Sequence, residues 1–184
     1  MLGIPGVGKS TIVQKLASSL SESNVVTFGS MMLEEGAKRR WVKNRDQLRK
    51  LPVEKQRLLQ KFAATSISKM KEGAVIVDTH LFVRTKEGYW PGLPFDVARA
   101  MKPTHLVLIE ASPVEIAKRR TSDKSRYRDP VSEKSLEEEL VLSRTLLAVT
   151  SNITGAPMLV VTNSDGKSSH AAKEIVSALE SSEK

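Results

Sequence analysis

The sequence predicts an α/β fold of three layers, with a parallel sheet between two layers of helices. Four short aliphatic runs predict the strands, because continuous β-branched runs of this length are typical of parallel strands covered on both faces. These runs are residues 25–28, 74–77, 106–109 and 158–161. Helix-length segments lie between and after them, at residues 9–20, 52–71, 113–120, 132–151 and 168–179. In the last segment, apolar residues recur at spacings of three and four, as on the buried face of a helix.

Length and composition predict one folded domain. The chain has 184 residues, 40% of them hydrophobic and 27% charged, which is ordinary globular usage and excludes a disordered protein. No repeat or long linker divides it, so we expect a single domain over residues 1–184. The absence of cysteine excludes disulfides, thiolate metal sites and cysteine nucleophiles. No apolar run approaches the length of a membrane span and no signal peptide is present, so we expect a cytoplasmic protein without a membrane partner.

Positive charge is concentrated in two segments. Lys and Arg total 29 against 21 Asp and Glu, a net charge of +8, which predicts an anionic partner. Residues 38–61 hold ten basic residues against two acids, and residues 118–134 hold seven against three. Both segments could be solvated helix faces, or they could bind phosphate groups. Aromatic residues make up only 4% of the chain, which argues against a base-stacking surface for nucleic acid.

A glycine-rich loop near the start of the chain carries the clearest chemical signal. Residues 3–10 read Gly-Ile-Pro-Gly-Val-Gly-Lys-Ser and fit the phosphate-loop pattern G-x-x-x-x-G-K-[ST] at every fixed position. The glycines let several backbone N–H groups converge on a polyphosphate, and the helix that follows favours the anion. Lys9 would reach the outer phosphates of ATP, and the Ser10 hydroxyl would bind Mg²⁺. The expected ATP-binding residues are Gly3, Ile4, Pro5, Gly6, Val7, Gly8, Lys9, Ser10 and Thr11.

The strand that should support this loop is short. A phosphate loop normally follows a central strand, but only Met1 and Leu2 precede Gly3. We therefore expect the first strand to be largely missing. Our interpretation is a start site placed too late, by about five apolar residues, which is the length of an ordinary strand.

Asp78 ends the second aliphatic run. A carboxylate at this place can orient Mg²⁺, directly or through water, which makes Asp78 a second candidate metal residue beside Ser10. The alternative is an acid that only shapes the turn, because turns also favour Asp.

Several motifs together resemble the archaeal type of adenylate kinase, a nucleoside monophosphate kinase of the P-loop class. The resemblance rests on the phosphate loop, on Asp78-Thr79-His80, on Arg84-Thr85 and on residues 88–94. It extends from about Gly3 to Leu179. Residues 45–56 are similar to part of the family's monophosphate-binding segment, about residues 29–61 here, and residues 119–131 are similar to its short lid.

The resemblance implies the reaction ATP + AMP ⇌ 2 ADP with Mg²⁺, serving adenine nucleotide homeostasis, and a homotrimeric assembly. It implies a P-loop NTPase fold with strand order 2-3-1-4-5. Lys9 and Arg84 would act in catalysis together with the lid arginines Arg126 and Arg128, and Arg119 and Arg120 would lie at the hinge of the lid. The expected AMP-binding residues are Gly29, Arg45, Thr79, His80 and Arg84. Ser30 departs from the family, because many relatives carry Asp there.

Other functions remain open on the residues alone. The acceptor could be CMP, UMP, dTMP or shikimate, because a few unlocated hydrogen bonds set its identity. The basic segments could instead serve an RNA-associated P-loop protein, with nucleic-acid binding as a secondary role. His80 could be a structural turn residue. Tyr89 and Trp90 could shape a loop rather than stack on a base, and Arg45 and Arg49, four residues apart, could hold a phosphate or face solvent.

Overall fold

A computed structural model describes residues 1–20, 22–71, 73–85, 87–122 and 132–181. All four predicted strands form, within two residues of the predicted bounds. β1 (Ser23–Thr27) pairs in parallel with β2 (Ala74–Asp78), and β5 (Leu106–Glu110) pairs in parallel with β6 (Met158–Thr162). Every residue of β5 is buried, which explains its uninterrupted aliphatic sequence.

Met1 and Leu2 take the place of the central strand between the two pairs. The Met1 amino group donates to the Val77 carbonyl at 2.9 Å, and the Met1 carbonyl accepts from Thr79 N at 3.1 Å. On the other side, Leu2 N donates to the Val107 carbonyl at 2.7 Å. The resulting order, β1, β2, residues 1–2, β5, β6, confirms the predicted order 2-3-1-4-5, with a first strand reduced to one bridge at Leu2.

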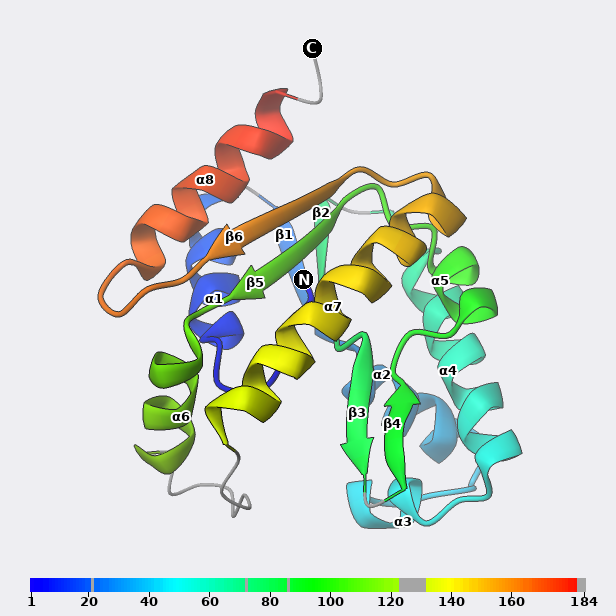
Figure 1. Cartoon of the computed structure of the whole chain (residues 1–184). Coiled ribbons are helices and arrows are strands. Elements are labelled where there is room, and N and C mark those ends of the chain that lie inside the picture. Colours follow the sequence, from blue (N-terminus) through cyan, green and yellow to red (C-terminus); the bar gives the residue numbers. More distant parts are fainter. Residues whose placement is uncertain (21, 72, 86, 123–131, 182–184) are drawn as a thin grey trace.

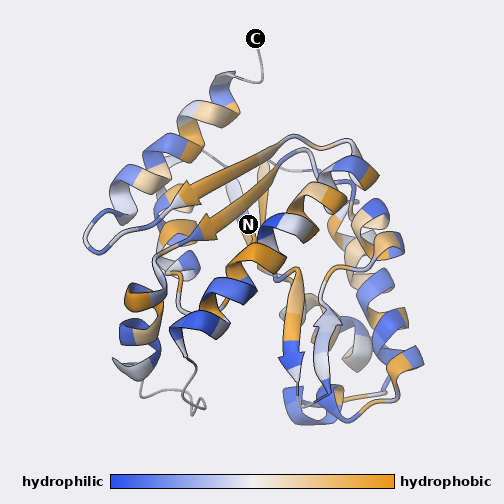
Figure 2. Ribbon diagram, in the orientation of Figure 1, coloured by the Kyte–Doolittle hydropathy of each residue, from blue (hydrophilic) through white to orange (hydrophobic). Residues whose placement is uncertain are grey.

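Helices cover both faces of this sheet, as predicted (Figure 1). α1 (Lys9–Ser19) and α8 (Ser168–Ser181) pack together on one face, and α7 (Glu133–Thr154) crosses the other face over β5 and β6. α6 (Pro113–Ser122) and α5 (Phe95–Met101) both pack against α7. The strands β5 and β6 are the most continuous apolar elements in Figure 2, and the main core gathers around them.

A second, smaller core holds the segment that follows β1. α2 (Phe28–Lys38), α3 (Arg45–Arg49) and α4 (Val53–Ile67) surround the buried side chains of Val42, Leu48 and Leu59. Asn44 caps α3 by accepting a hydrogen bond from Gln47 N at 2.9 Å. This small core positions three basic residues of the segment 38–61, Arg45, Arg49 and Arg57, on the cavity that the phosphate loop also lines.

The structure corrects several element predictions. Phe28 begins α2 instead of ending the first strand, and the helix predicted over 52–71 ends at Ile67. An antiparallel hairpin of β3 (Phe82–Thr85) and β4 (Gly88–Pro91) was not predicted, because β4 is exposed along its whole length and shows no apolar pattern. The short helix α5 was also missed. Within the described residues, no helix is both long enough and apolar enough to span a membrane.

Candidate functional site

The phosphate loop leads directly from Leu2 into α1. Gly8 precedes the helix in a left-handed conformation with φ of 84°, which glycine adopts without strain. A Cβ added at Gly3 would lie 2.7 Å from the Ile109 carbonyl oxygen, so only glycine fits where the loop leaves the sheet. The loop and the free amides in the first turn of α1 therefore form one wall of a large cavity, as an anion site requires.

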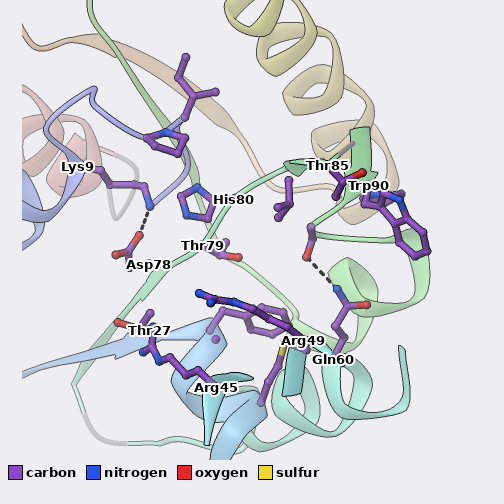
Figure 3. A pocket seen from close by; sticks show the side chains of 18 of the residues that line it. Lys9, Thr27, Arg45, Arg49, Gln60, Asp78, Thr79, His80, Thr85 and Trp90 are labelled. Carbon is purple, nitrogen blue, oxygen red and sulfur yellow. Dashed lines mark hydrogen bonds and ion pairs between the residues drawn. The ribbon is translucent and has the colours of Figure 1, made fainter. Parts of the chain in front are cut away.

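That cavity has a volume of about 1220 Å³ and lies between the phosphate loop, the α2–α4 segment and the β3–β4 hairpin (Figure 3). Most of the predicted ATP-binding residues line it: Ile4, Pro5, Gly6, Gly8, Lys9, Ser10 and Thr11. Val7 does not, because its side chain is completely buried in the main core. Gly3 lies at the base of the loop, where its carbonyl accepts from His80.

Lys9 and Asp78 form an ion pair in the cavity wall, drawn as a dashed line in Figure 3. Lys9 is 7% exposed. Burial lowers the pKa of Lys9 from its usual 10.5, and the neighbouring Asp78 carboxylate opposes that shift. Asp78 ends β2 at the edge of the sheet where the phosphate loop begins, so the predicted metal residues Asp78 and Ser10 share one cavity.

Ser10 and Asp78 fit a magnesium ion, because Mg²⁺ prefers oxygen ligands and takes one or two from a protein beside those of a nucleotide. Among the described residues, no group of three or more acids or histidines could hold a metal alone. The ion would therefore depend on phosphate oxygens for its remaining ligands.

The opposite wall of the cavity is basic. Arg45, Arg49 and Arg57 reach it from α3 and α4. Arg45 donates to the Ser30 hydroxyl at 2.9 Å, so Ser30 orients this arginine without neutralising it. The predicted AMP residues Gly29, Thr79 and His80 line the same cavity. In Figure 3, Arg45 and Arg49 lie on one side of an open space and Lys9 lies on the other.

His80 contacts the base of the phosphate loop. Its Nδ1 lies 2.8 Å from the Gly3 carbonyl oxygen, which makes it a donor in the tautomer that carries the proton there. The ring also lines the cavity. His80 thus has the structural contact that the turn interpretation predicts, and it remains within reach of a bound molecule.

Arg84, like Gly3, Val7 and Arg120, is a predicted site residue that the structure leaves outside the cavity lining. Its Nη1 donates to the Ser135 hydroxyl at 2.8 Å and to Glu139 Oε1 at 3.2 Å, both on α7. Its neighbours in β3, Val83 and Thr85, do line the cavity. In this structure the guanidinium group of Arg84 is therefore held beside the site.

The two arginines at the end of α6 also contact the phosphate loop. Arg119 lines the cavity, donates to the Val7 carbonyl at 3.2 Å and pairs with Asp165 at 2.6 Å. Arg120 donates to the Pro5 carbonyl at 2.8 Å. The other two predicted lid arginines, Arg126 and Arg128, lie outside the described residues.

Sequence reasoning missed several cavity residues. On α4, positions 53, 56, 57 and 60 recur at helical spacing and form one wall, a pattern that could have been found. Gln60 Nε2 lies 3.5 Å from the Gly92 carbonyl, at the hairpin side. No local pattern marks Thr27, Phe28 and Met32, which reach the cavity only through the tertiary fold, whereas Thr85 and Trp90, which also line it, belong to the motifs that carry the family resemblance.

Comparison with known proteins agrees with this geometry. Residues 2–137 match the AAA domain family. The adenylate kinase of Thermoplasma volcanium is 42% identical, with 95% of this chain and 94% of that protein covered. The adenylate kinase of Thermoplasma acidophilum is 40% identical over 96% of this chain and 95% of that protein. For Methanocaldococcus jannaschii adenylate kinase, identity is 37% and coverage is 97% and 96%.

Solved structures show the same fold. The shikimate kinase from Acinetobacter baumannii has a TM-score of 0.62 at 16% identity, covering 98% of this chain and 91% of that one. The shikimate kinase from Bacteroides thetaiotaomicron has a TM-score of 0.63 at 15% identity, with 97% and 96% covered. At 15–16% identity, the similarity shows only that the fold is shared. The relatives at 37–42% identity match over nearly the whole length of the chain, and residues 2–137 match the AAA domain. This chain therefore belongs to the adenylate kinase family.

Proposed function

We propose that this chain catalyses the reversible, magnesium-dependent reaction ATP + AMP ⇌ 2 ADP. One observation carries the proposal: a single cavity of about 1220 Å³ has a phosphate loop in one wall and a cluster of arginines in the other. This volume exceeds the roughly 300–1,000 Å³ of ordinary small-molecule pockets, as two nucleotides require. Residues 1–184 form one kinase domain in this proposal, with a monophosphate segment over about 29–61 and a lid over about 119–131.

The donor nucleotide binds at the phosphate loop. The free amides at the start of α1 and the glycines of the loop face its phosphates, and Lys9 supplies a cation for the outer ones. Lys9 is already held at the wall by Asp78, so little conformational freedom is lost when phosphate binds. Ser10 and Asp78 would hold Mg²⁺ on the nucleotide, where the ion neutralises charge on the phosphate oxygens.

The acceptor nucleotide binds at the arginine wall. Arg45 and Arg49 on α3, with Arg57 on α4, bind and orient its phosphate. An oxygen of this phosphate forms the new bond to the γ-phosphorus of ATP, while the bond from that phosphorus to the β-bridging oxygen breaks, so two ADP molecules result. The attacking oxygen is already anionic, so no general base is needed. Arg84 and the lid arginines Arg126 and Arg128 stabilise the transferring group as the lid closes, and Arg119 and Arg120 lie at the hinge of the lid.

The test measures ADP formation from Mg-ATP with AMP, CMP, UMP, GMP and dTMP in parallel. We expect AMP to be preferred at least about tenfold, which corresponds to roughly 1.4 kcal/mol of discrimination. Removal of Mg²⁺ with EDTA should abolish the reaction. Preference for another acceptor would overturn the assignment of AMP, and silence with every acceptor would favour an RNA-associated role for the basic segments.

The assembly and compartment are part of the same proposal. The adenylate kinase resemblance supports a homotrimer, and the cysteine-free composition supports a cytoplasmic location. Both are open to direct measurement, by light scattering and by fractionation of the source cells.

A further inference from the structure

Glu139 is a buried carboxylate with two arginine partners. It lies in the middle of α7 and is 3% exposed. Its Oε1 pairs with Arg84 Nη1 and its Oε2 with Arg120 Nη2, each at 3.2 Å. A carboxylate in the interior costs free energy unless it is paired, and here each oxygen has its own guanidinium group.

The two arginines come from two different elements that border the cavity. Arg84 lies in β3 of the hairpin, between two residues that line the cavity. Arg120 lies in the last turn of α6 and donates at 2.8 Å to the carbonyl of Pro5 in the phosphate loop. Glu139 therefore joins the hairpin and the phosphate-loop side of the site through one carboxylate.

Among the residues that the structure describes, the charges in this cluster are not balanced. Two cations face one anion, with Ser135 as the other described partner of Arg84, and neither arginine is among the described residues that line the cavity. Without Glu139 the two guanidinium groups would repel one another and lose their orientation. With it they stay fixed beside the cavity, with one positive charge in excess for an anion to use.

We propose that Glu139 is a positioning residue, which orients Arg84 and Arg120 for the phosphoryl group as it passes between the nucleotides. The inference rests on the proposed function. Positioning acts on the transition state, so its loss should lower kcat much more than it raises KM for ATP. A purely structural Glu139 would instead change stability and leave kcat alone.

The test compares Glu139→Gln with a matched control, Glu110→Gln. Glu110 is equally buried, at 3% exposed, and also pairs with an arginine, but this is Arg144 of α7 rather than an arginine of the hairpin or one that contacts the phosphate loop. Both variants remove one buried charge and should unfold at lower temperature. We expect kcat to fall about 10- to 100-fold in Glu139→Gln only, because a misplacement of about 1 Å can cost that much.

A conservative variant covers the case in which Glu139→Gln does not fold. Glu139→Asp keeps the charge and shortens the side chain, so it should fold and show a smaller loss of kcat. Folded Glu139→Gln with the kcat of Glu110→Gln, or folded Glu139→Asp with the wild-type kcat, would overturn the inference. The wild-type chain is assayed first, and a wild type that forms no ADP from ATP and AMP would refute the proposed function instead.

Discussion

At the scale of single residues, Lys9 is the cation that the phosphate loop contributes to the cavity. It is buried and paired with Asp78 in the wall of the cavity. Burial normally disfavours an ammonium group, so its position depends on the anions that it meets there. In the proposed reaction, phosphate joins Asp78 as a partner of Lys9.

Lys9→Met should reduce ADP formation by about 10³-fold or more, because a preorganised cation of the transition state is lost. Circular dichroism should show a folded protein. The control is Lys15→Met on the same helix, since Lys15 bonds Ser169 and lies outside the cavity. Lys15→Met should keep its activity, and turnover in Lys9→Met equal to that of the control would contradict the role of Lys9.

Arg49→Ala should raise KM for AMP roughly tenfold to a hundredfold, because a hydrogen bond to a charged group contributes about 1.5 to 3 kcal/mol. KM for ATP should change little. Arg49 lines the cavity, and its one side-chain partner among the described residues is Asp46, in an exposed ion pair at 3.5 Å, so the variant should fold normally. Lys50→Ala is the matched control, because Lys50 is the next basic residue and does not line the cavity. An equal rise of KM for AMP in both variants would show that Arg49 acts only through its positive charge and does not contact AMP.

At the scale of the elements, Glu35 joins two helices of the acceptor segment. It is a buried residue of α2 that accepts hydrogen bonds from Arg39, from Lys38 at 3.1 Å and from Ser66 of α4 at 3.1 Å. Burial by itself raises the pKa of Glu35, but these hydrogen bonds outweigh it, so the pKa lies below its usual 4.5. The contact between α2 and α4 therefore depends on an ionised carboxylate.

Glu35→Gln should destabilise the protein at pH 7 by about 2 kcal/mol, the typical loss for hydrogen bonds to a charged group. For a chain of this length, that lowers the melting temperature by roughly 4 to 8 °C. Glu34→Gln is the control, because Glu34 is 56% exposed and pairs only with Lys38 among the described residues. Similar melting temperatures for the two variants would show that the Ser66 and Arg39 contacts contribute little.

The same carboxylate predicts a dependence on pH. Because its pKa is lower in the folded state than in the unfolded state, its contribution is fully present above pH 4.5 and is lost as the pH falls below that value. The difference in melting temperature between wild type and Glu35→Gln should therefore shrink at a pH of about 3.5. A difference that stays constant between pH 7 and that pH would contradict this account.

At the scale of the whole molecule, assembly is the first property to measure. A homotrimer of this 20.3 kDa chain should give a light-scattering mass of about three times that value. The mass should not fall as salt is raised if apolar contacts hold the trimer, since screening weakens only charge pairs. A mass of one chain at working concentrations would remove the trimer from the proposal.

Part of the fold and of the site can be predicted from short stretches of sequence. The aliphatic runs predict β1, β2, β5 and β6, because β-branched residues favour strands. Burial of both faces holds only for β5, which is buried along its whole length, whereas β1 has no buried residue. The phosphate loop is equally local, because positive φ and close approach require glycine at set spacings. The β3–β4 hairpin was not predicted because β4 is exposed and shows no apolar pattern, and α5 was missed because it is held by its contacts with α4 and α7.

The sequence by itself determined the class of the fold, the phosphate loop and the excess of positive charge for anionic substrates. Only the tertiary structure decided which cations share the cavity, where Arg84 lies, and that Glu35 and Glu139 are buried. The physical reason is the range of each interaction. Backbone geometry and burial periodicity act over a few neighbouring residues, whereas an ion pair such as Arg84 with Glu139 joins positions 55 apart and exists only after the chain has folded.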